Sequence, residues 1–419
     1  MHAGSSLLLL LFLAAFSINA TEPFVHPFDD QAAFGQHLFT FEPSGKVAPF
    51  DLIRLLMPKG KRQWINASME HRGKIYNFIL TRRADLFDQN FHEWNKKHLP
   101  DRSVFYDDFY SCLYDGYALH DKNMRIAIAG CNSSKRGLLA MADGSFLLIE
   151  PIPPTTRAKL QEFGSHVDDL HTLRKRDVGS IYQPVENKCL HSFDSNKSAP
   201  LSFRRYWTVA ASLRKDSRPN RLQTGPLKPD EFASTSASSL VIETALFVDA
   251  RTWQRFAKVY GEKSADKELL SFVVATVHNV NALFRHPTIV PKLRMQIKKY
   301  EVLKKTPPEL ADHMHAHGEA ELLLKAFCNY QEKKNVPYDN DPRHWDHAIL
   351  FTGHDIYSNG LKAVAGFAPV GGMCNPFKSC TINEGVDFGC VFVIAHEMGH
   401  RCLTHHDTIQ SNILRLVLE

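Results

Sequence analysis

The segment Ala395-His396-Glu397-Met398-Gly399-His400 places two histidines four residues apart with a glutamate beside the first. On a helix, residues at this spacing share one face, so both imidazoles can bind a single Zn²⁺ ion. Glu397 would then act as a general base and take a proton from a water that the ion activates. The motif predicts zinc-assisted hydrolysis of a peptide bond.

A third histidine is expected, because catalytic zinc sites use three protein ligands and leave one position open. His406 lies ten residues after His396, at a spacing that fits a chain turning back toward the metal. It is the favoured third ligand. His405 is a competing ligand, and the alternative is that both histidines are exposed residues after a helix end.

The region around this motif reads as strands alternating with helices, which indicates an α/β domain. An apolar helix candidate at 388–394 leads directly into the motif. Further strands are expected at 240–248, 293–303 and 348–351, and further helices at 253–260, 267–284 and 315–332.

The earlier part of the chain, about 21–170, reads as mostly β. Short apolar or partly alternating runs predict strands at 75–80, 124–129 and 145–149. From about 171 to 238 the composition shifts to basic dipeptides, Pro, Ser and Thr. This stretch predicts an exposed linker.

The N-terminus predicts a signal peptide over residues 1–20, with an apolar run at 7–16 and the small Ala20 at the position before the cleavage site. That run is too short to span a bilayer, and nothing later reaches about 18 apolar residues, so no transmembrane segment is expected in the mature chain. N-glycosylation sequons at Asn66, Asn132 and Asn196 agree with secretion. The eight cysteines should then mostly be paired.

Composition excludes several classes of protein. Hydrophobic residues make up 44% and charged residues 23% of the 419 positions, which is ordinary for globular domains and excludes collagen, coiled coils and wholly disordered chains. Lys and Arg total 50 against 45 for Asp and Glu. So small an excess argues against a nucleic-acid partner.

The linker carries a candidate processing site. Residues 218–221 read Arg-Pro-Asn-Arg and match the R-x-x-R pattern of proprotein convertases, which would cleave after Arg221. Arg176 is the next candidate. The alternative is that a charged linker contains such a tetrad by accident.

The segment 396–407 resembles the metzincin pattern H-E-x-x-H-x-x-G-x-x-H-D, and the chain from about 30 to 407 resembles the secreted ADAMTS metalloproteases. Residues 112–116 and the stretch from 136–138 to 148–151 are similar to the propeptide of that family. Residues 365–368 through 373–374 are similar to the strand and loop that precede its active-site helix.

The resemblance implies an α/β metzincin-type catalytic domain, with a mixed twisted sheet and an active-site helix, over residues 222–419. It implies a β-rich propeptide over 21–221 that includes the basic linker. It also implies an edge strand at Gly366 that pairs with extended substrate.

The resemblance further assigns roles to single residues. It makes His396, His400 and His406 the zinc ligands and Glu397 the catalytic base. It implies Ca²⁺ at Glu243, Asp339 and Asp346, a latency thiolate at Cys189, and the disulfide Cys328–Cys380. Cys112 and Cys131 would pair with each other.

The chain departs from the family pattern near its end. Leu403 stands where metzincins often have Gly, and a left-handed backbone there would be strained by roughly 1–2 kcal/mol. No methionine follows Met398, so the methionine turn and the C-terminal part of the catalytic domain are expected to be missing from a truncated product. Cys374 lacks its family partner, for which Cys390 or Cys402 would substitute.

The leading expectation is a secreted zinc metalloendopeptidase, made as a zymogen, that acts on proteins of the extracellular space or matrix. The alternative is a catalytically incompetent product that binds and inhibits a related protease. A structural zinc protein is the weaker third alternative, because structural zinc sites fill four positions with protein ligands.

Overall fold

The structure is a computed structural model that describes residues 50–401 apart from 59–61, 132–133, 153, 155–156, 159–166, 176–239, 287–288, 290–291, 361, 363, 370–371, 374 and 386. The described residues belong to one compact unit. The signal peptide, the processing site at Arg221, and Cys189, Asn132, Asn196, Cys374, Cys402, Leu403, His405 and His406 lie outside the described residues.

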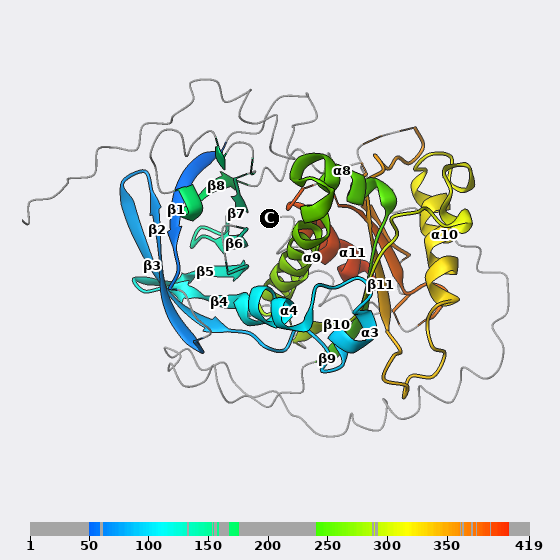
Figure 1. The fold of residues 1–419 in the computed structure, drawn as a ribbon, viewed down its shortest axis with the longest axis horizontal. Helices are drawn as coiled ribbons and strands as arrows, with labels where there is room; N and C mark the ends of the chain where they lie inside the picture. Colours follow the sequence, from blue (N-terminus) through cyan, green and yellow to red (C-terminus); the bar gives the residue numbers. More distant parts are fainter. Residues whose placement is uncertain are drawn as a thin grey trace, which may run out of the picture. The chain divides into compact units, whose positions relative to one another are not determined.

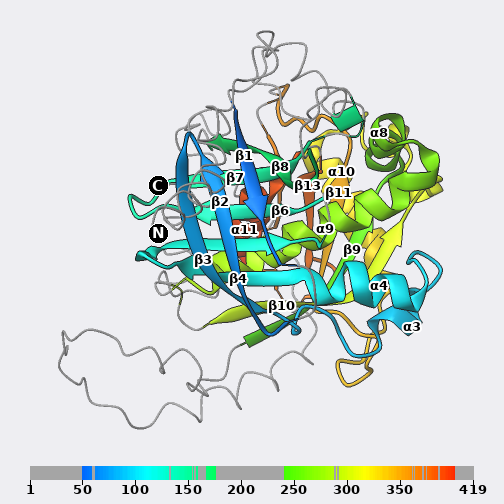
Figure 2. The same ribbon diagram turned by 60° about the vertical axis from the view of Figure 1, so that its left-hand side comes forward.

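The N-terminal part is a closed barrel of eight strands, β1 to β8, each paired antiparallel with the next, and β8 paired with β1 (Figure 2). Its strands are β1 Asp51–Leu56, β2 Trp64–His71, β3 Lys74–Arg82, β4 Leu113–Ala118, β5 Asp121–Ala129, β6 Arg136–Ala140, β7 Phe146–Pro151 and β8 Leu170–Lys175. All three strands expected in this region lie within or largely within β3, β5 and β7.

Inward-facing side chains fill the barrel. On β2, Ile65, Ala67 and Met69 are buried while Asn66 between them is exposed, which is the period of two expected of a strand with one face in a core. β8 begins where the basic linker was expected, because its residues close the barrel between β1 and β7 and bury His171. Residues 176–239, which follow this strand, lie outside the described residues.

An insertion between β3 and β4 carries two short helices, α3 Phe91–Asn95 and α4 Arg102–Asp108, and the 3-10 turn η1 Tyr110–Cys112. A second 3-10 turn, η2 Val167–Asp169, precedes β8. The disulfide Cys112–Cys131, with Cα atoms 5.1 Å apart, ties the end of the insertion to the end of β5.

The C-terminal part is an α/β domain with a mixed sheet in the order β10-β9-β11-β13-β12, as expected (Figure 1). The first four strands run parallel and β12 runs antiparallel to β13 at the edge. The strands are β9 Leu240–Val248, β10 Leu293–Val302, β11 His347–Thr352, β12 Gly366–Phe367 and β13 Cys380–Glu384.

Helices cover both faces of this sheet, α9 and α11 on one and α10 on the other (Figure 1). They are α8 Ala250–Tyr260, α9 Glu262–Phe284, α10 Ala320–Glu332 and α11 Cys390–Arg401, with 3-10 turns η5 Pro308–Leu310 and η6 Asp312–Met314 before α10. Side chains of β9 alternate between the two cores: Leu246 faces α9 and Phe247 faces α10. Each face is therefore buried, as parallel sheets require.

The barrel and the α/β domain share one hydrophobic cluster, which contains Leu138 and Leu148 of the barrel together with residues of α9 and α11. The rings of Phe146 and Phe392 lie edge to face with centroids 5.3 Å apart. The buried ring of His278 on α9 hydrogen-bonds the Tyr114 carbonyl at 2.9 Å. The contact combines apolar packing with polar groups that are satisfied across it.

The insertion also covers the outer edge of β10. Ile297 donates its N–H to the Leu86 carbonyl at 2.7 Å, and Asp88 donates its N–H to the Ile297 carbonyl at 3.1 Å. Asn95 continues the cover, since its amide donates to the Lys298 carbonyl and accepts from the Tyr300 N–H, both at 2.9 Å. These bonds satisfy backbone groups that an edge strand leaves open.

Among the described residues, none of the helices is both long enough and apolar enough to cross a lipid bilayer.

Candidate active site

The motif helix α11 is fixed by its apolar residues. Val391, Phe392, Ile394, Ala395 and Met398 are all buried in the cluster that α11 shares with α9. Helices apolar on so much of their surface are stable only inside a core.

The loop before α11 sets where the helix begins. Asp387 accepts the N–H of Gly389 at 2.6 Å through its carboxylate. A Cβ at position 389 would lie 2.7 Å from the same Asp387 oxygen, so a larger residue there would displace this carboxylate. The tight turn places Cys390 as the first helical residue.

His396 and His400 both lie on α11, one helical turn apart, as the motif requires. His396 is half-buried, and Glu397 is buried with 5% of its surface exposed. A carboxylate is rarely buried to this degree unless it is paired or has a function.

The edge strand β12 lies directly against this carboxylate. A Cβ on Gly366 would lie 2.9 Å from Glu397 Cγ, 3.0 Å from its Oε1 and 2.5 Å from Val393 Cγ1. Glycine is therefore needed at 366 for the strand to come this close to α11. The outer side of β12 has no strand paired with it among the described residues.

The residues present fit a zinc ion. Histidines at positions 396 and 400, one turn apart on a helix, supply the residue type that Zn²⁺ prefers as a nitrogen donor, and the carboxylate of Glu397 matches a general base. The proposed third ligand, His406, lies outside the described residues.

Two of the three expected calcium carboxylates lie together. Ligand atoms of Asp339, His344 and Asp346 fall within 4.8 Å of one another, so His344 joins a set in which the sequence indicated only acids. Burial, with added repulsion from Glu243 and Asp339, raises the pKa of Asp346.

Glu243, the third expected calcium residue, is joined to Asp346 through its backbone. Its N–H donates to Asp346 Oδ2 at 2.8 Å, and its carbonyl accepts the Asp346 N–H at 2.8 Å. Its own carboxylate faces Lys298, whose Nζ lies 2.8 Å from Glu243 Oε1 and 2.9 Å from Asp88 Oδ2. An ammonium therefore already neutralises Glu243.

The described cysteines of the α/β domain include one disulfide pair and one free thiol. Cys328 on α10 and Cys380 on β13 form a disulfide with Cα atoms 5.5 Å apart, the pairing that the resemblance implies. Cys390 is free and buried among the described residues, with its sulfur 3.8 Å from Thr276 Oγ1. Burial raises the pKa of the Cys390 thiol, which keeps it protonated.

Three further side chains, for which the sequence predicts no site, also lie together: Asp312, His315 and His354. The run Asp312-His313-Met314-His315-Ala316-His317 is a histidine-rich tract of the kind that binds metals, and this signal was available in the sequence. Nothing in the sequence indicates that His354 lies beside it.

Glu384 is another group that the sequence did not single out. It accepts the N–H of Ile356 at 2.8 Å, and burial raises its pKa to about 7.

Comparison with known proteins agrees with this arrangement. The reprolysin profile of metallopeptidase family M12 matches residues 244–413. "A disintegrin and metalloproteinase with thrombospondin motifs adt-1" of Caenorhabditis elegans is 30% identical over 315 residues, which cover 73% of this chain and 20% of that protein. The mouse proteins of the same name numbered 18 and 1 are both 28% identical, over 71% and 72% of this chain and over 25% and 30% of their own lengths.

The chain thus spans between a fifth and a third of the length of these relatives. Archaemetzincin from Methanopyrus kandleri aligns with 45% of this chain and 89% of its own, at 15% identity and a TM-score of 0.24, a value too low to add to the argument. The family match covers β11, β13 and the motif helix α11, and the relatives extend over most of the chain. This chain therefore belongs to metallopeptidase family M12 through residues 244–413, which form a metalloprotease catalytic domain of the ADAMTS type.

Proposed function

We propose that this chain is a secreted zinc metalloendopeptidase, made as a zymogen, that hydrolyses peptide bonds of extracellular proteins. The observation that carries the proposal is the position of Glu397, buried on the motif helix and in contact distance of the edge strand at Gly366. An extended peptide that paired with β12 would bring its backbone alongside this carboxylate.

His396, His400 and His406 would hold the zinc ion, which supplies Lewis acidity toward a peptide carbonyl and a water molecule. Glu397 would accept the proton of the attacking water on its carboxylate and deliver it to the leaving amine. The buried apolar surroundings of α11 hold the helix, and with it this carboxylate, in place.

The barrel would be the main folded part of the propeptide, with Cys189 as the thiolate that blocks the zinc. In support, the barrel packs on the motif helix through Phe146 and Phe392. A proprotein convertase cleaving after Arg221 would separate the two parts of the chain. Secretion, the signal peptide at 1–20 and glycosylation at Asn66, Asn132 and Asn196 belong to the same proposal; Asn66 is exposed on β2, as a glycan site must be.

Calcium is proposed at Asp339 and Asp346, with Glu243 beside them. The crowding of these carboxylates supports it, because a hard cation with oxygen ligands would relieve their repulsion. Asp346 links the start of β11 to β9 through Glu243, so the ion would stabilise this end of the sheet.

The test is cleavage of a broad quenched-peptide library by secreted, processed protein, together with its zinc content. Glu397→Gln should reduce cleavage by about 10²–10⁴-fold while zinc is retained, because general-base catalysis contributes that much. Glu321→Gln, an exposed glutamate of α10, is the matched control and should change nothing. Zinc binding without cleavage in the native chain would reject the enzyme and leave a protease-binding or inhibitory product.

A further inference from the structure

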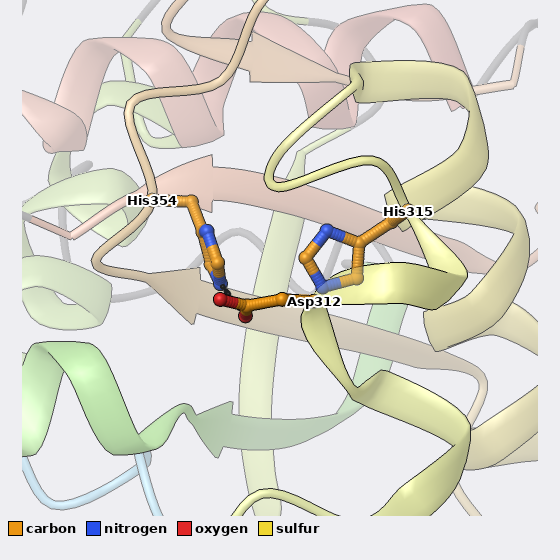
Figure 3. Close-up of side chains that lie close together, drawn as sticks. All are labelled: Asp312, His315 and His354. Atoms are coloured by element: carbon orange, nitrogen blue, oxygen red, sulfur yellow. Dashed lines mark ion pairs between the residues drawn. The ribbon is translucent and has the colours of Figure 1, made fainter.

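A second group of metal-binding side chains lies away from the motif helix, on the loops that follow two parallel strands. Asp312 belongs to η6, His315 follows that turn directly, and His354 lies two residues beyond β11. Figure 3 shows the His315 ring pointing toward both other side chains. One ligand atom from each of the three lies within 4.8 Å of the others.

One nitrogen of the His315 ring is hydrogen-bonded and, within the described part of the chain, the other is not. Its side chain is fully buried, and its Nε2 faces the Leu310 carbonyl at 3.3 Å. A carbonyl only accepts, so the proton of the neutral ring is on Nε2 and the lone pair is on Nδ1. Nδ1 has no hydrogen-bond partner among the described residues. Metal-binding histidines commonly donate their other N–H to a carbonyl in this way.

Asp312 and His354 complete the group. His354 is 7% exposed, its ring stands nearly perpendicular to that of His315 with centroids 4.8 Å apart, and its Nε2 lies 3.6 Å from Asp312 Oδ1. The other Asp312 oxygen, Oδ2, accepts from Arg251 at 2.6 Å. This ion pair holds the carboxylate with Oδ1 toward His354, as hydrogen-bond partners of metal ligands commonly do.

A small cavity borders two of the three side chains. His315 and His354 line a cavity of about 20 Å³, together with Asp249, Leu310 and Leu350. A cavity of this size is slightly larger than one water molecule needs. Gly318 is required beside it, because its φ is +120° and a Cβ there would lie 3.4 Å from His354 Cβ.

We propose that Asp312, His315 and His354 bind a second Zn²⁺ ion, separate from the one at the motif helix. Two imidazoles and one carboxylate are zinc ligands, whereas Ca²⁺ takes oxygen ligands. Zinc bonds of about 2.0–2.1 Å place tetrahedral ligand atoms roughly 3.3 Å apart, so binding draws the group together by up to about 1.5 Å.

Such an ion would have a structural consequence for this chain. It would join the segment between β10 and α10 to the end of β11, two segments that the disulfide Cys328–Cys380 does not connect directly. Asp312 is 36% exposed at its side chain, so a water molecule can take the fourth position.

The test is the number of zinc ions per chain, measured by mass spectrometry of metals on the dialysed full-length protein. Two equivalents are expected in the native chain and one in His396→Ala, which keeps only the second site. Asp312→Asn and His354→Gln should each lose one equivalent. His313→Ala, an exposed histidine of the same turn, is the matched control and should keep two.

A second measurement does not depend on how well the buried variants fold. Zinc added to metal-free His396→Ala protein should raise its Tm, and the same addition should leave the double variant His396→Ala/Asp312→Asn unchanged. One zinc in the native chain that disappears in His396→Ala, or an unchanged count in Asp312→Asn, would overturn the second site. Zinc that persists in His396→Ala but is lost in its double variant with Asp312→Asn would support the second site, whether or not the chain cleaves peptides.

Discussion

At the scale of single residues, the position of the proposed catalytic base depends on a glycine in the neighbouring strand. Gly366 gives β12 its approach to α11, and any Cβ at this position would meet Glu397 and Val393. The identity of residue 366 therefore controls the position of the carboxylate, although residue 366 itself carries no chemistry.

We expect Gly366→Ala to reduce peptide cleavage by on the order of 10²-fold, because a displacement of about 1 Å at a reacting group has that effect. The added methyl group should also lower the free energy of unfolding by about 1–3 kcal/mol through overpacking. Activity and urea unfolding would both be measured.

The control for this change is Gly385→Ala. There the new Cβ would lie 3.0 Å from Phe351 Cβ, so the crowding falls on β11 instead of Glu397. A similar loss of stability with activity preserved is expected. Equal losses of activity in the two variants would show that the effect of residue 366 is only on folding.

Sequence alone could predict the residues of the motif, because a spacing of four residues on a helix fixes a shared face. It also indicated a strand at Gly366. It could not bring His315 and His354 together, since they lie on either side of α10 in the chain. They meet because β10 and β11, the strands that precede them, both run parallel to β9 and end at the same edge of the sheet.

At the scale of elements, the helices show where periodicity is informative and where it is not. α9 begins at Glu262, whereas the sequence predicts a start at 267. The prediction is late because the first turn of the helix is polar and carries no apolar repeat. α10 begins at Ala320, after the expected residue 315, because Ala316 and His317 have φ of 47° and 61° and end any helical path there. Periodicity misses the start of α9 because that turn is polar, and the start of α10 because it does not report the local backbone.

α9 also carries a pH-dependent contact with the barrel. Burial lowers the pKa of His278 to about 4, and its neutral ring bonds the Tyr114 carbonyl. Above pH 6.5 the ring is neutral in both the folded and the unfolded chain, so it adds no pH dependence to the free energy of unfolding. Between pH 6.5 and 4 the unfolded chain binds a proton that the folded chain does not, so stability falls as the pH falls.

We expect His278→Gln to remove this part of the pH dependence, which amounts to about 3 kcal/mol across that window. Glutamine can still donate to the Tyr114 carbonyl. Urea unfolding at pH 7 and pH 5 checks the difference, with His313→Gln as an exposed control. An unchanged pH slope in His278→Gln would show that other groups carry the acid sensitivity.

At the scale of the whole molecule, the sequence predicted two kinds of region, one of strands and one of alternating helices and strands. It did not predict that they share a hydrophobic cluster, because that cluster is built from residues far apart in the chain, such as Leu148 and Phe392. The composition of each region is the same whether or not the two regions touch.

Replacement of Asp115 would test how strongly the barrel and the α/β domain are coupled. Its carboxylate lies 2.6 Å from Arg83 of the barrel and 2.6 Å from Arg285 at the end of α9. Burial acts to raise its pKa, but the two guanidinium groups, Arg285 first, lower it overall. The residue is therefore charged at neutral pH and holds both cations.

We expect Asp115→Asn to lower the free energy of unfolding by about 2–3 kcal/mol, because two partly buried guanidinium groups lose their counter-ion. Thermal unfolding followed by calorimetry should change from one transition toward two, as the barrel and the α/β domain separate. Asp121→Asn, at the far end of the β4–β5 hairpin, is the control. A single transition at the native temperature would mean that apolar packing alone couples the regions.

The cover on the outer edge of β10 has a consequence for the proposed cleavage after Arg221. Leu86, Asp88 and Asn95 occupy the hydrogen-bonding groups of β10 as long as the N-terminal part remains in place. If the proposed cleavage released that part, the sheet would have an unpaired strand at each end, and in the proposed mechanism only the one at β12 would pair with substrate. β10 would then be an exposed edge to which the β10 strand of a second cleaved molecule could pair, so the proposed activation would bring a tendency to self-association.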